Sequence, residues 1–281
     1  MLALLTLCAC ASSPTYLEPD SPSLMAGRFT DLAGLAWAPE QGALYFADVG
    51  TDRVYRWEPG REPPRVWREG TERIGALVAG EDEGLIAAEQ AAGRLARIDL
   101  NRKDVRVLAA SFDGLSFEAP RDLEWGRAGC LYVVTRKGSL LHMNAAGDLI
   151  EMQPGTKVAG VACNADGTAL AILVPGEQQV VQLSLDDAGL PTGEPRILAT
   201  TGRDPEALEL DAQGVIYVAS RAGIERFAPN GTALSTTPHV RHARALAFGE
   251  ADGRTLFAMT ATEVWRMRCP TPGARFEFVP E

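Results

Sequence analysis

Apolar and polar residues alternate in two short runs within residues 203–220, which read RDPEALELDAQGVIYVAS. The runs EALEL and VIYVAS each show the period of two that is typical of a strand with one buried face. Between them, the tetrapeptide DAQG supplies the Asp and Gly residues that tight turns favour. The stretch therefore predicts a loop followed by an antiparallel hairpin.

The same pattern occurs five more times along the chain. The first residues of the six copies are Ala33, Gly75, Arg121, Ala159, Glu206 and Arg244. Consecutive copies begin 38 to 47 residues apart, a period typical of propeller blades. A third strand follows each hairpin and a weaker fourth follows most of them, without helical segments of convincing length between strands. We therefore predict an all-β fold, a six-bladed β-propeller with four antiparallel strands per blade.

We expect a terminal strand to close this ring. Two segments qualify, FTDL near residue 30 and ARFEFV at residues 274–279, and the sequence does not decide between them. In either case the first residue of each copy should lie at the start of an innermost strand. These six positions, which we call the ring residues, then surround one mouth of the central channel.

Three parts of the chain differ in composition. Residues 1–11 (MLALLTLCACA) are apolar, residues 12–28 begin with a Ser- and Pro-rich run, and residues 29–281 contain the repeats. The first part resembles a bacterial lipoprotein signal in which Cys10 is lipidated, although no Lys or Arg precedes the apolar run. We therefore expect a leader, a tether and a propeller, in an extracytoplasmic (periplasmic or outer-membrane) lipoprotein anchored at Cys10. The alternative is a frayed apolar N-terminus on a cytosolic protein.

The charge balance narrows the possible partners. The chain has 27 basic and 37 acidic residues, a formal net charge of −10. Such a surface repels phosphate backbones, so we expect no nucleic-acid partner, and membrane contact only through a lipidated Cys10. Cys130 and Cys163 lie on expected strands as small apolar residues, and no metal-binding pattern of Cys or His occurs.

Several stretches resemble the gluconolactonase, senescence-marker (regucalcin) and luciferin-regenerating-enzyme family of six-bladed propellers. They are GLSFEAPRDLEWGRAGCLYVV, GLIAAEQAAGRLARIDL, DPEALELDAQGVIYVASRAGIERFAPNG and RALAFGEADGRTLFAMTATEVWRM, and the resemblance covers residues 29–268. It implies a lactone hydrolase with one divalent cation, calcium or zinc, at the channel mouth.

The family's cation ligands are a Glu, two Asn and an Asp at the starts of innermost strands. By resemblance these positions fall on Ala33, Arg121, Ala159 and Glu206. Only Glu206 keeps a carboxylate, and Arg121 brings a positive charge to the place of the cation. Calcium and zinc each need more ligands than one carboxylate supplies. We therefore expect no metal cofactor; calcium or zinc would be present only if the family site survives.

Arg121 and Glu206 occupy equivalent positions two blades apart. We predict that the guanidinium replaces the cation as the counter-ion of Glu206, the alternative being two solvated side chains that do not meet. Arg244 is a further ring residue, and two cations against one anion would favour an anionic ligand. His242, like His239, lies on the loop before the sixth copy and is a candidate ligand-binding residue. Asp122 and Glu206 are candidate catalytic residues, and Asp122, like Asp204, could act as a general base.

Two classes of function follow from this pattern. In the first, the protein is a degenerate gluconolactonase-like propeller that binds a small polar or anionic ligand, or a protein partner, at the channel mouth. In the second, it is a lactone hydrolase that uses a rearranged site. The fold does not choose between them, because function depends on the site residues.

Overall fold

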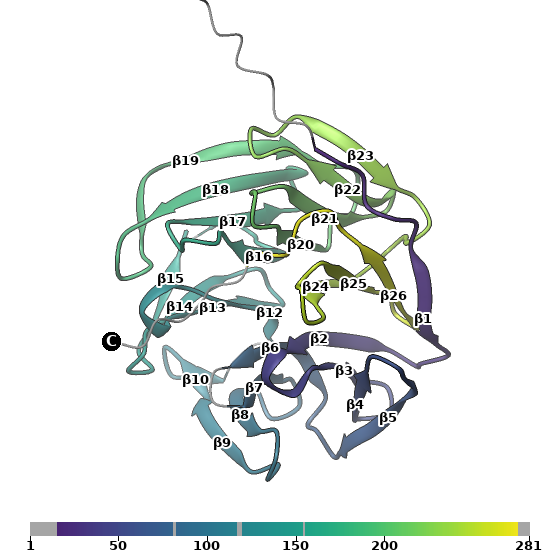
Figure 1. Ribbon diagram of the computed structural model, residues 1–281. Helices are drawn as coiled ribbons and strands as arrows, with labels where there is room; N and C mark the ends of the chain where they lie inside the picture. Colours follow the sequence, from purple (N-terminus) through teal and green to yellow (C-terminus); the bar gives the residue numbers. More distant parts are fainter. Residues whose placement is uncertain (1–15, 81–82, 117–119, 154, 275–281) are drawn as a thin grey trace, which may run out of the picture.

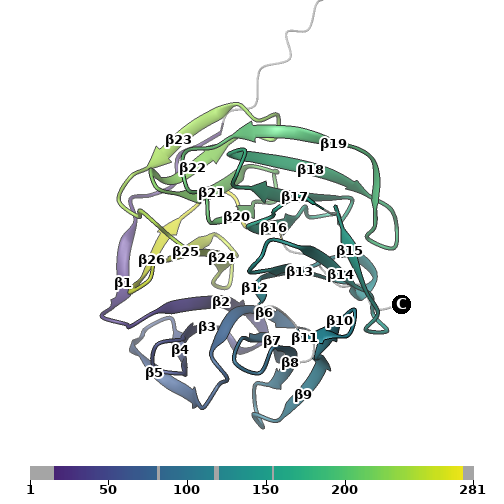
Figure 2. The ribbon, with the colours of Figure 1, turned by 180° about the vertical axis from the view of Figure 1, so that it is seen from behind.

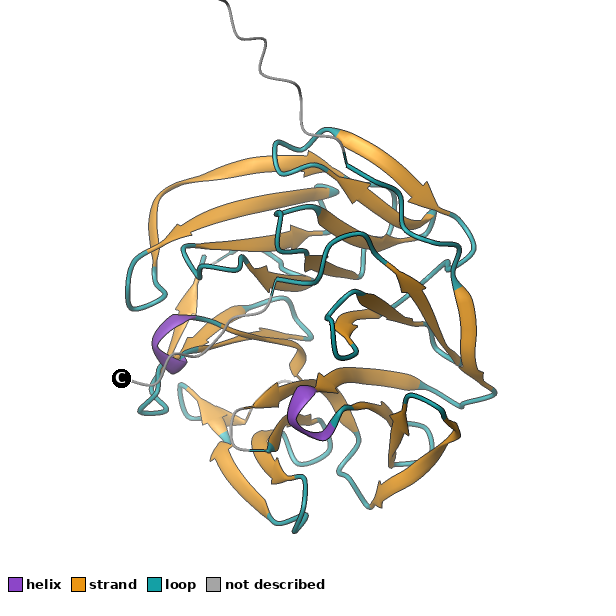
Figure 3. Cartoon of the chain, in the orientation of Figure 1, coloured by secondary structure: helices purple, strands orange, loops and turns teal. Residues whose placement is uncertain are grey.

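The computed structural model describes residues 16–80, 83–116, 120–153 and 155–274, and within them it confirms the six-bladed propeller. Six antiparallel sheets of four strands surround a common centre (Figure 1, Figure 2). The described residues also include two short 3-10 helices, η1 (Pro39–Gln41) and η2 (Arg127–Gly129) (Figure 3). A small hairpin of β10 (Ser111–Phe112) and β11 (Leu115–Ser116) precedes blade 3.

The blades are numbered 1 to 6 in the order of their innermost strands along the chain. The innermost strands are β2 (Leu32–Ala38), β6 (Ile74–Gly80), β12 (Pro120–Trp125), β16 (Gly160–Cys163), β20 (Ala207–Leu210) and β24 (Ala245–Gly249). Each of the six ring residues lies within one position of the start of its strand, as predicted.

Three further strands complete each blade. The second strands are β3 (Ala43–Asp48), β7 (Gly84–Glu89), β13 (Leu131–Thr135), β17 (Ala169–Val174), β21 (Ile216–Ser220) and β25 (Thr255–Met259). The third strands are β4 (Arg53–Glu58), β8 (Arg94–Asp99), β14 (Leu140–Met143), β18 (Gln179–Leu185), β22 (Gly223–Phe227) and β26 (Glu263–Arg268). The outermost strands are β5 (Arg61–Glu69), β9 (Val105–Ala109), β15 (Leu149–Met152), β19 (Pro191–Thr200), β23 (Ala233–Thr237) and, in blade 6, β1 (Ser23–Gly27).

The turn after β20 shows how the repeated motif folds locally. One carboxylate oxygen of Asp211 accepts hydrogen bonds from the backbone N–H groups of Gln213 and Val215, both at 2.9 Å. Gly214 has a φ of 77°, a left-handed value that costs glycine little. Its N–H donates to the carbonyl of Asp211 at 2.8 Å, which closes the turn. The Asp-x-x-Gly spacing thus fixes the hairpin between β20 and β21.

A terminal strand closes the ring as expected, but it is β1, which lies before the FTDL segment. Strand β1 pairs antiparallel with β26 and supplies the outermost strand of blade 6. Residues 29–31 instead connect β1 to β2, and residues 275–279 lie outside the described residues. Part of the stretch expected to be a tether, residues 23–27, is therefore a strand of the propeller. Its residues are mostly exposed and show no clear alternation, so the sequence carried no strand signal there.

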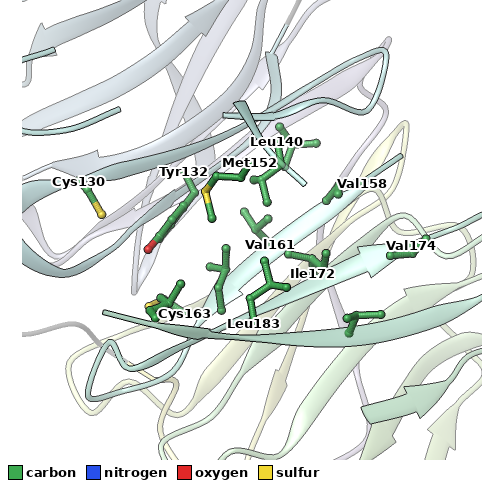
Figure 4. Packing of buried hydrophobic residues seen from close by; sticks show 14 residues of the cluster. Cys130, Tyr132, Leu140, Met152, Val158, Val161, Cys163, Ile172, Val174 and Leu183 are labelled. Carbon is green, nitrogen blue, oxygen red and sulfur yellow. The ribbon is translucent and has the colours of Figure 1, made fainter. Parts of the chain in front are cut away.

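Apolar side chains fill the spaces between neighbouring blades. All six residues of β3, of β7 and of β17 are buried, because a second strand is covered on both faces by the adjacent blades. Between blades 3 and 4, side chains from β13 and β16 interdigitate around Tyr132, whose hydroxyl donates to the carbonyl of Gly189 at 2.7 Å (Figure 4). Cys130 and Cys163 belong to this cluster as free thiols. This packing sets the position of blade 3 relative to blade 4.

In the part of the chain that the structure describes, we find no helix with the length and apolar character needed to cross a bilayer.

Candidate functional site

A cavity of about 780 Å³ follows the innermost strands at the centre of the propeller. It extends from the ring residues Ala33, Arg121 and Arg244 at one end to Trp37, Trp125 and Phe248, which follow at the ends of the same strands. Small apolar residues of β2, β6, β20 and β24 form most of its wall. A largely apolar concave site with a few polar groups is the usual form of a small-molecule site.

Arg121 and Glu206 form the predicted ion pair at the mouth of this cavity. Nη2 of Arg121 lies 2.7 Å from Oε2 of Glu206, and also 3.4 Å from the backbone oxygen of Glu206. The two side chains are 31% and 43% exposed, so water screens the pair only in part. Arg121 thus crosses from blade 3 to blade 5 past the shorter residues of blade 4.

Arg244 is held by a carboxylate that the sequence did not single out. Its Nη1 lies 2.6 Å from Oδ1 of Asp31, which precedes β2, and 3.5 Å from the backbone oxygen of Leu32. The mouth therefore carries two ion pairs, Arg121–Glu206 and Arg244–Asp31. The net positive mouth expected from ring residues alone is wrong, since Asp31 balances Arg244.

Asp122 points from β12 toward blade 4. Its Oδ2 accepts a hydrogen bond from the backbone N–H of Val161 at 2.9 Å, and its Oδ1 accepts one from its neighbour Leu123 at 3.0 Å. Burial raises the pKa of Asp122 to about 6, although the two N–H donors and the charge of Arg121 act in the opposite direction. The carboxyl thus titrates near neutral pH at the wall of the cavity.

Four further carboxyl groups that the sequence analysis missed line the cavity, those of Glu40, Glu83, Glu124 and Glu209. Glu124 on β12 and Glu209 on β20 both line the wall. Burial, followed by the charge of Asp122, raises the pKa of Glu209 to about 8. Burial, followed by the charges of Glu209 and Asp122, raises the pKa of Glu124 well above its ordinary value. Near neutral pH the carboxyl of Glu209 is therefore largely a neutral acid, a form that can donate a hydrogen bond.

The repeat itself contained a signal for this pair. Glu124 and Glu209 each stand three positions after a ring residue, in the third and fifth copies. The other four copies have Ala36, Val78, Ala162 and Ala247 at that position. A carboxylate where equivalent positions are small and apolar indicates a polar group aimed into the channel rather than a surface residue.

His239 and His242 lie outside the site. Both are exposed on the loop before β24, and neither is among the residues that line the cavity. His242 has a φ of 57° and its N–H donates to the carbonyl of Ser220 at 3.3 Å, so this backbone belongs to a turn. The structure therefore brings together Arg121, Asp122, Glu206 and Arg244, but not His242.

The residues at the mouth do not fit a divalent cation. Ala33 has no ligating side-chain atom, and Ala159 is buried among apolar residues of blades 4 and 5. The one carboxylate of the set, on Glu206, is bonded to the guanidinium of Arg121. Within the described ranges, no group of three or more His, Cys, Asp or Glu is arranged to hold a metal ion. A dication at this place would face a fixed positive charge with one carboxylate in support.

Residues 33–262 match the family model described as SMP-30/Gluconolactonase/LRE-like region. The chain belongs to this family. It is 24% identical over 285 residues to the gluconolactonase of Zymomonas mobilis subsp. mobilis, which covers 85% of this chain and 79% of that protein.

Solved structures show the same fold. A gluconolactonase from Xanthomonas campestris, described as important in glucose secondary metabolic pathways, superimposes with a TM-score of 0.79 at 21% identity, covering 89% of each chain. Regucalcin, a calcium-binding protein from Agrobacterium tumefaciens, superimposes with a TM-score of 0.74 at 17% identity, covering 92% of this chain and 98% of that chain. At such identities the likeness to these structures establishes the fold alone. The chemistry of the site has to be argued from the residues of this chain.

A first prediction concerns the Arg121–Glu206 pair. Arg121→Gln should lower the free energy of unfolding by about 1 kcal/mol, because it leaves a partly buried carboxylate without its counter-ion. Glu206→Gln in the Arg121→Gln background should recover part of that loss. Urea unfolding of the four proteins in this double-mutant cycle measures the coupling. A coupling energy of zero would show that the two side chains meet without stabilising each other.

Proposed function

We propose that this protein is a gluconolactonase-like propeller that binds a small molecule in its central cavity, with the Arg121–Glu206 ion pair in the place of a divalent cation. The observation that carries the proposal is the 2.7 Å contact between the two side chains at the cavity mouth. A guanidinium there neutralises Glu206 as a cation would, and it keeps N–H groups for a ligand.

The charges of the site favour a neutral, polyhydroxylated ligand over an anionic one. Both arginines at the mouth are already paired, and five carboxyl groups line the cavity, those of Glu40, Glu83, Asp122, Glu124 and Glu209. Each of these groups that is ionised repels an anion, whereas the hydroxyl groups of a ligand can pair with a carboxyl group in either protonation state. A sugar or a sugar lactone has this chemistry, and its apolar ring face suits the small apolar residues of the wall.

A second candidate function, hydrolysis of a lactone, is favoured by the pKa of Asp122. A carboxyl group with a pKa of about 6 exists largely as carboxylate at neutral pH and is more basic than an ordinary Asp. In this reaction Asp122 would take a proton from water as the water oxygen attacks the lactone carbonyl. The ring C–O bond then breaks as Asp122 returns the proton to the departing ring oxygen, which gives a hydroxy acid, and Arg121 would stabilise the oxyanion. The gluconolactonase name of the Zymomonas relative supports keeping this candidate.

One set of measurements separates the two candidates. Purified protein should contain no stoichiometric calcium or zinc, and calorimetric binding of glucono-δ-lactone should be unchanged by a chelator. Stoichiometric metal, or binding that the chelator abolishes, would contradict the cation-free site. If the protein also hydrolyses the lactone, Asp122→Asn should reduce kcat by at least about a hundredfold while KM changes little. The exposed variant Asp187→Asn serves as the control.

A further inference from the structure

A second cavity, of about 210 Å³, lies on the outer part of blade 1, away from the central channel. Strands β4 and β5 form one side, and Lys103, between β8 and β9 of blade 2, forms the other. Four basic residues line it, namely Arg56, Arg61, Arg65 and Lys103. Arg56 and Arg65 stand directly opposite each other on the paired strands, an arrangement of like charges that disfavours folding unless it is compensated.

The compensation within the protein is incomplete. Glu58 is the acidic residue of the cavity, and it is bonded to Arg56 and, at 2.7 Å, to Arg61. Of the residues described, none gives Arg65 or Lys103 a carboxylate within salt-bridge distance. Four cations against one carboxylate leave three surplus positive charges, in a chain whose net charge is −10. A cluster of positive charges of this kind on an otherwise acidic protein attracts anions to the cavity.

Two of these cations are held in place before any ligand arrives. Nζ of Lys103 donates to the backbone oxygen of Trp67 at 2.6 Å and lies 5.5 Å from the centre of the Trp67 ring. The guanidinium of Arg56 lies 6.0 Å from the ring centre of Tyr45, which itself packs edge-on against Trp67. Side chains fixed in this way lose less conformational entropy when they bind an anion than free surface lysines and arginines do.

We propose that this cavity binds a phosphoryl group, a compact and negatively charged oxyanion. Its volume accommodates such a group, the guanidinium of Arg65 can donate two parallel hydrogen bonds to it, and Lys103 supplies a second charge. The group can belong to a small phosphate ester or to an anionic lipid headgroup, which share this chemistry. The site is separate from the central cavity, so it does not rest on the proposed function.

The first test is calorimetric titration of the full chain with inorganic phosphate at low ionic strength. The double variant Arg65→Gln/Lys103→Gln should weaken binding by at least about tenfold. The matched control is Arg127→Gln/Arg196→Gln, which also removes two positive charges but lies outside the cavity. It should change the dissociation constant by less than about twofold, since only the diffuse charge changes.

The second test uses vesicles of phosphatidylcholine with and without phosphatidylglycerol, with Cys10→Ser in every protein so that a lipid anchor cannot contribute. Sedimentation with the anionic vesicles that is lost in the cavity variant assigns the headgroup as the source of the phosphoryl group. Saturable binding of phosphate without vesicle binding assigns a soluble ester. The proposal is overturned if neither probe binds saturably, or if the cavity variant and the control weaken binding equally.

Discussion

Glu209→Gln is expected to stabilise the protein at alkaline pH and to change its stability little at acid pH. The carboxyl of Glu209 has a pKa of about 8 in the folded protein, against an ordinary value of 4.5. Because the folded state disfavours the charged form, the contribution of Glu209 to the free energy of unfolding is highest below pH 4.5, where both states hold the proton. It falls as the pH rises from 4.5 to about 8 and stays low above that range.

The size of this effect follows from the same difference in pKa. At about 1.4 kcal/mol per pKa unit, the shift corresponds to roughly 5 kcal/mol in the alkaline range. Water in the cavity screens part of this, so we expect the neutral amide to recover about 3 kcal/mol. Urea unfolding of both proteins at about pH 5 and about pH 9 measures the difference.

The control for this prediction is Glu151→Gln, which removes an exposed carboxylate of β15. It should shift the unfolding free energy by the same small amount at both pH values. If Glu209→Gln behaved in that way too, its carboxyl would be ionised in the folded protein at neutral pH. The cavity wall would then be strongly anionic, and the case for a neutral sugar-like ligand would weaken in favour of a cationic one.

The architecture was predictable because each blade repeats a local signal. Alternating residues specify the strands, and turn residues such as Asp211 and Gly214 fix the hairpins without help from distant parts of the chain. The repeat also aligns positions in space. Arg121 and Glu206 are 85 residues apart in sequence, but they occupy equivalent positions in two copies of the repeat. Equivalent positions face the same mouth of the channel, and the ion pair could be predicted for that reason.

The remaining features depend on contacts that the repeat does not encode. Asp31 meets Arg244 only because the ring closes, since the chain brings the start of blade 1 beside blade 6 across 213 residues. The shifted pKa of Glu124 depends on Glu209 as well as on burial, and therefore on how two blades face each other. Strand β1 has an exposed, irregular pattern because an outermost strand has little apolar surface to bury.

Residues 16–20, which we call the N-terminal strap, lie before β1 and cover a buried cation of blade 5. Arg226 on β22 is only 2% exposed, and its Nη1 lies 2.9 Å from Oε2 of Glu18. Its Nη2 donates to the carbonyl of Leu17 at 2.8 Å. The guanidinium also stands 5.5 Å from the ring centre of Tyr217. The strap thus supplies a counter-ion 208 residues away in sequence, just before the strand that closes the ring.

Glu18→Gln is therefore expected to lower the free energy of unfolding by about 2 kcal/mol, because a buried guanidinium loses its carboxylate. The loss should be smaller than that of a fully buried pair, because the Glu18 side chain is 62% exposed. In an Arg226→Met background, which removes the buried charge and keeps an apolar side chain of similar length, Glu18→Gln should have almost no effect. Urea unfolding of the four proteins gives the coupling energy directly.

The matched control is the exposed pair Arg127–Asp187, whose side chains meet at the same 2.9 Å although that of Asp187 is 97% exposed. Asp187→Asn should cost less than about 0.5 kcal/mol, since water replaces the lost partner. Equal costs at Glu18 and Asp187 would mean that the distance alone sets the strength of both pairs. A Glu18→Gln effect that persists without Arg226 would mean that the strap is held by its backbone and apolar contacts. If Glu18→Gln lowers the free energy of unfolding strongly only when Arg226 is present, the pairing of Glu18 with the buried cation is what holds the N-terminal strap, and with it β1, against the ring.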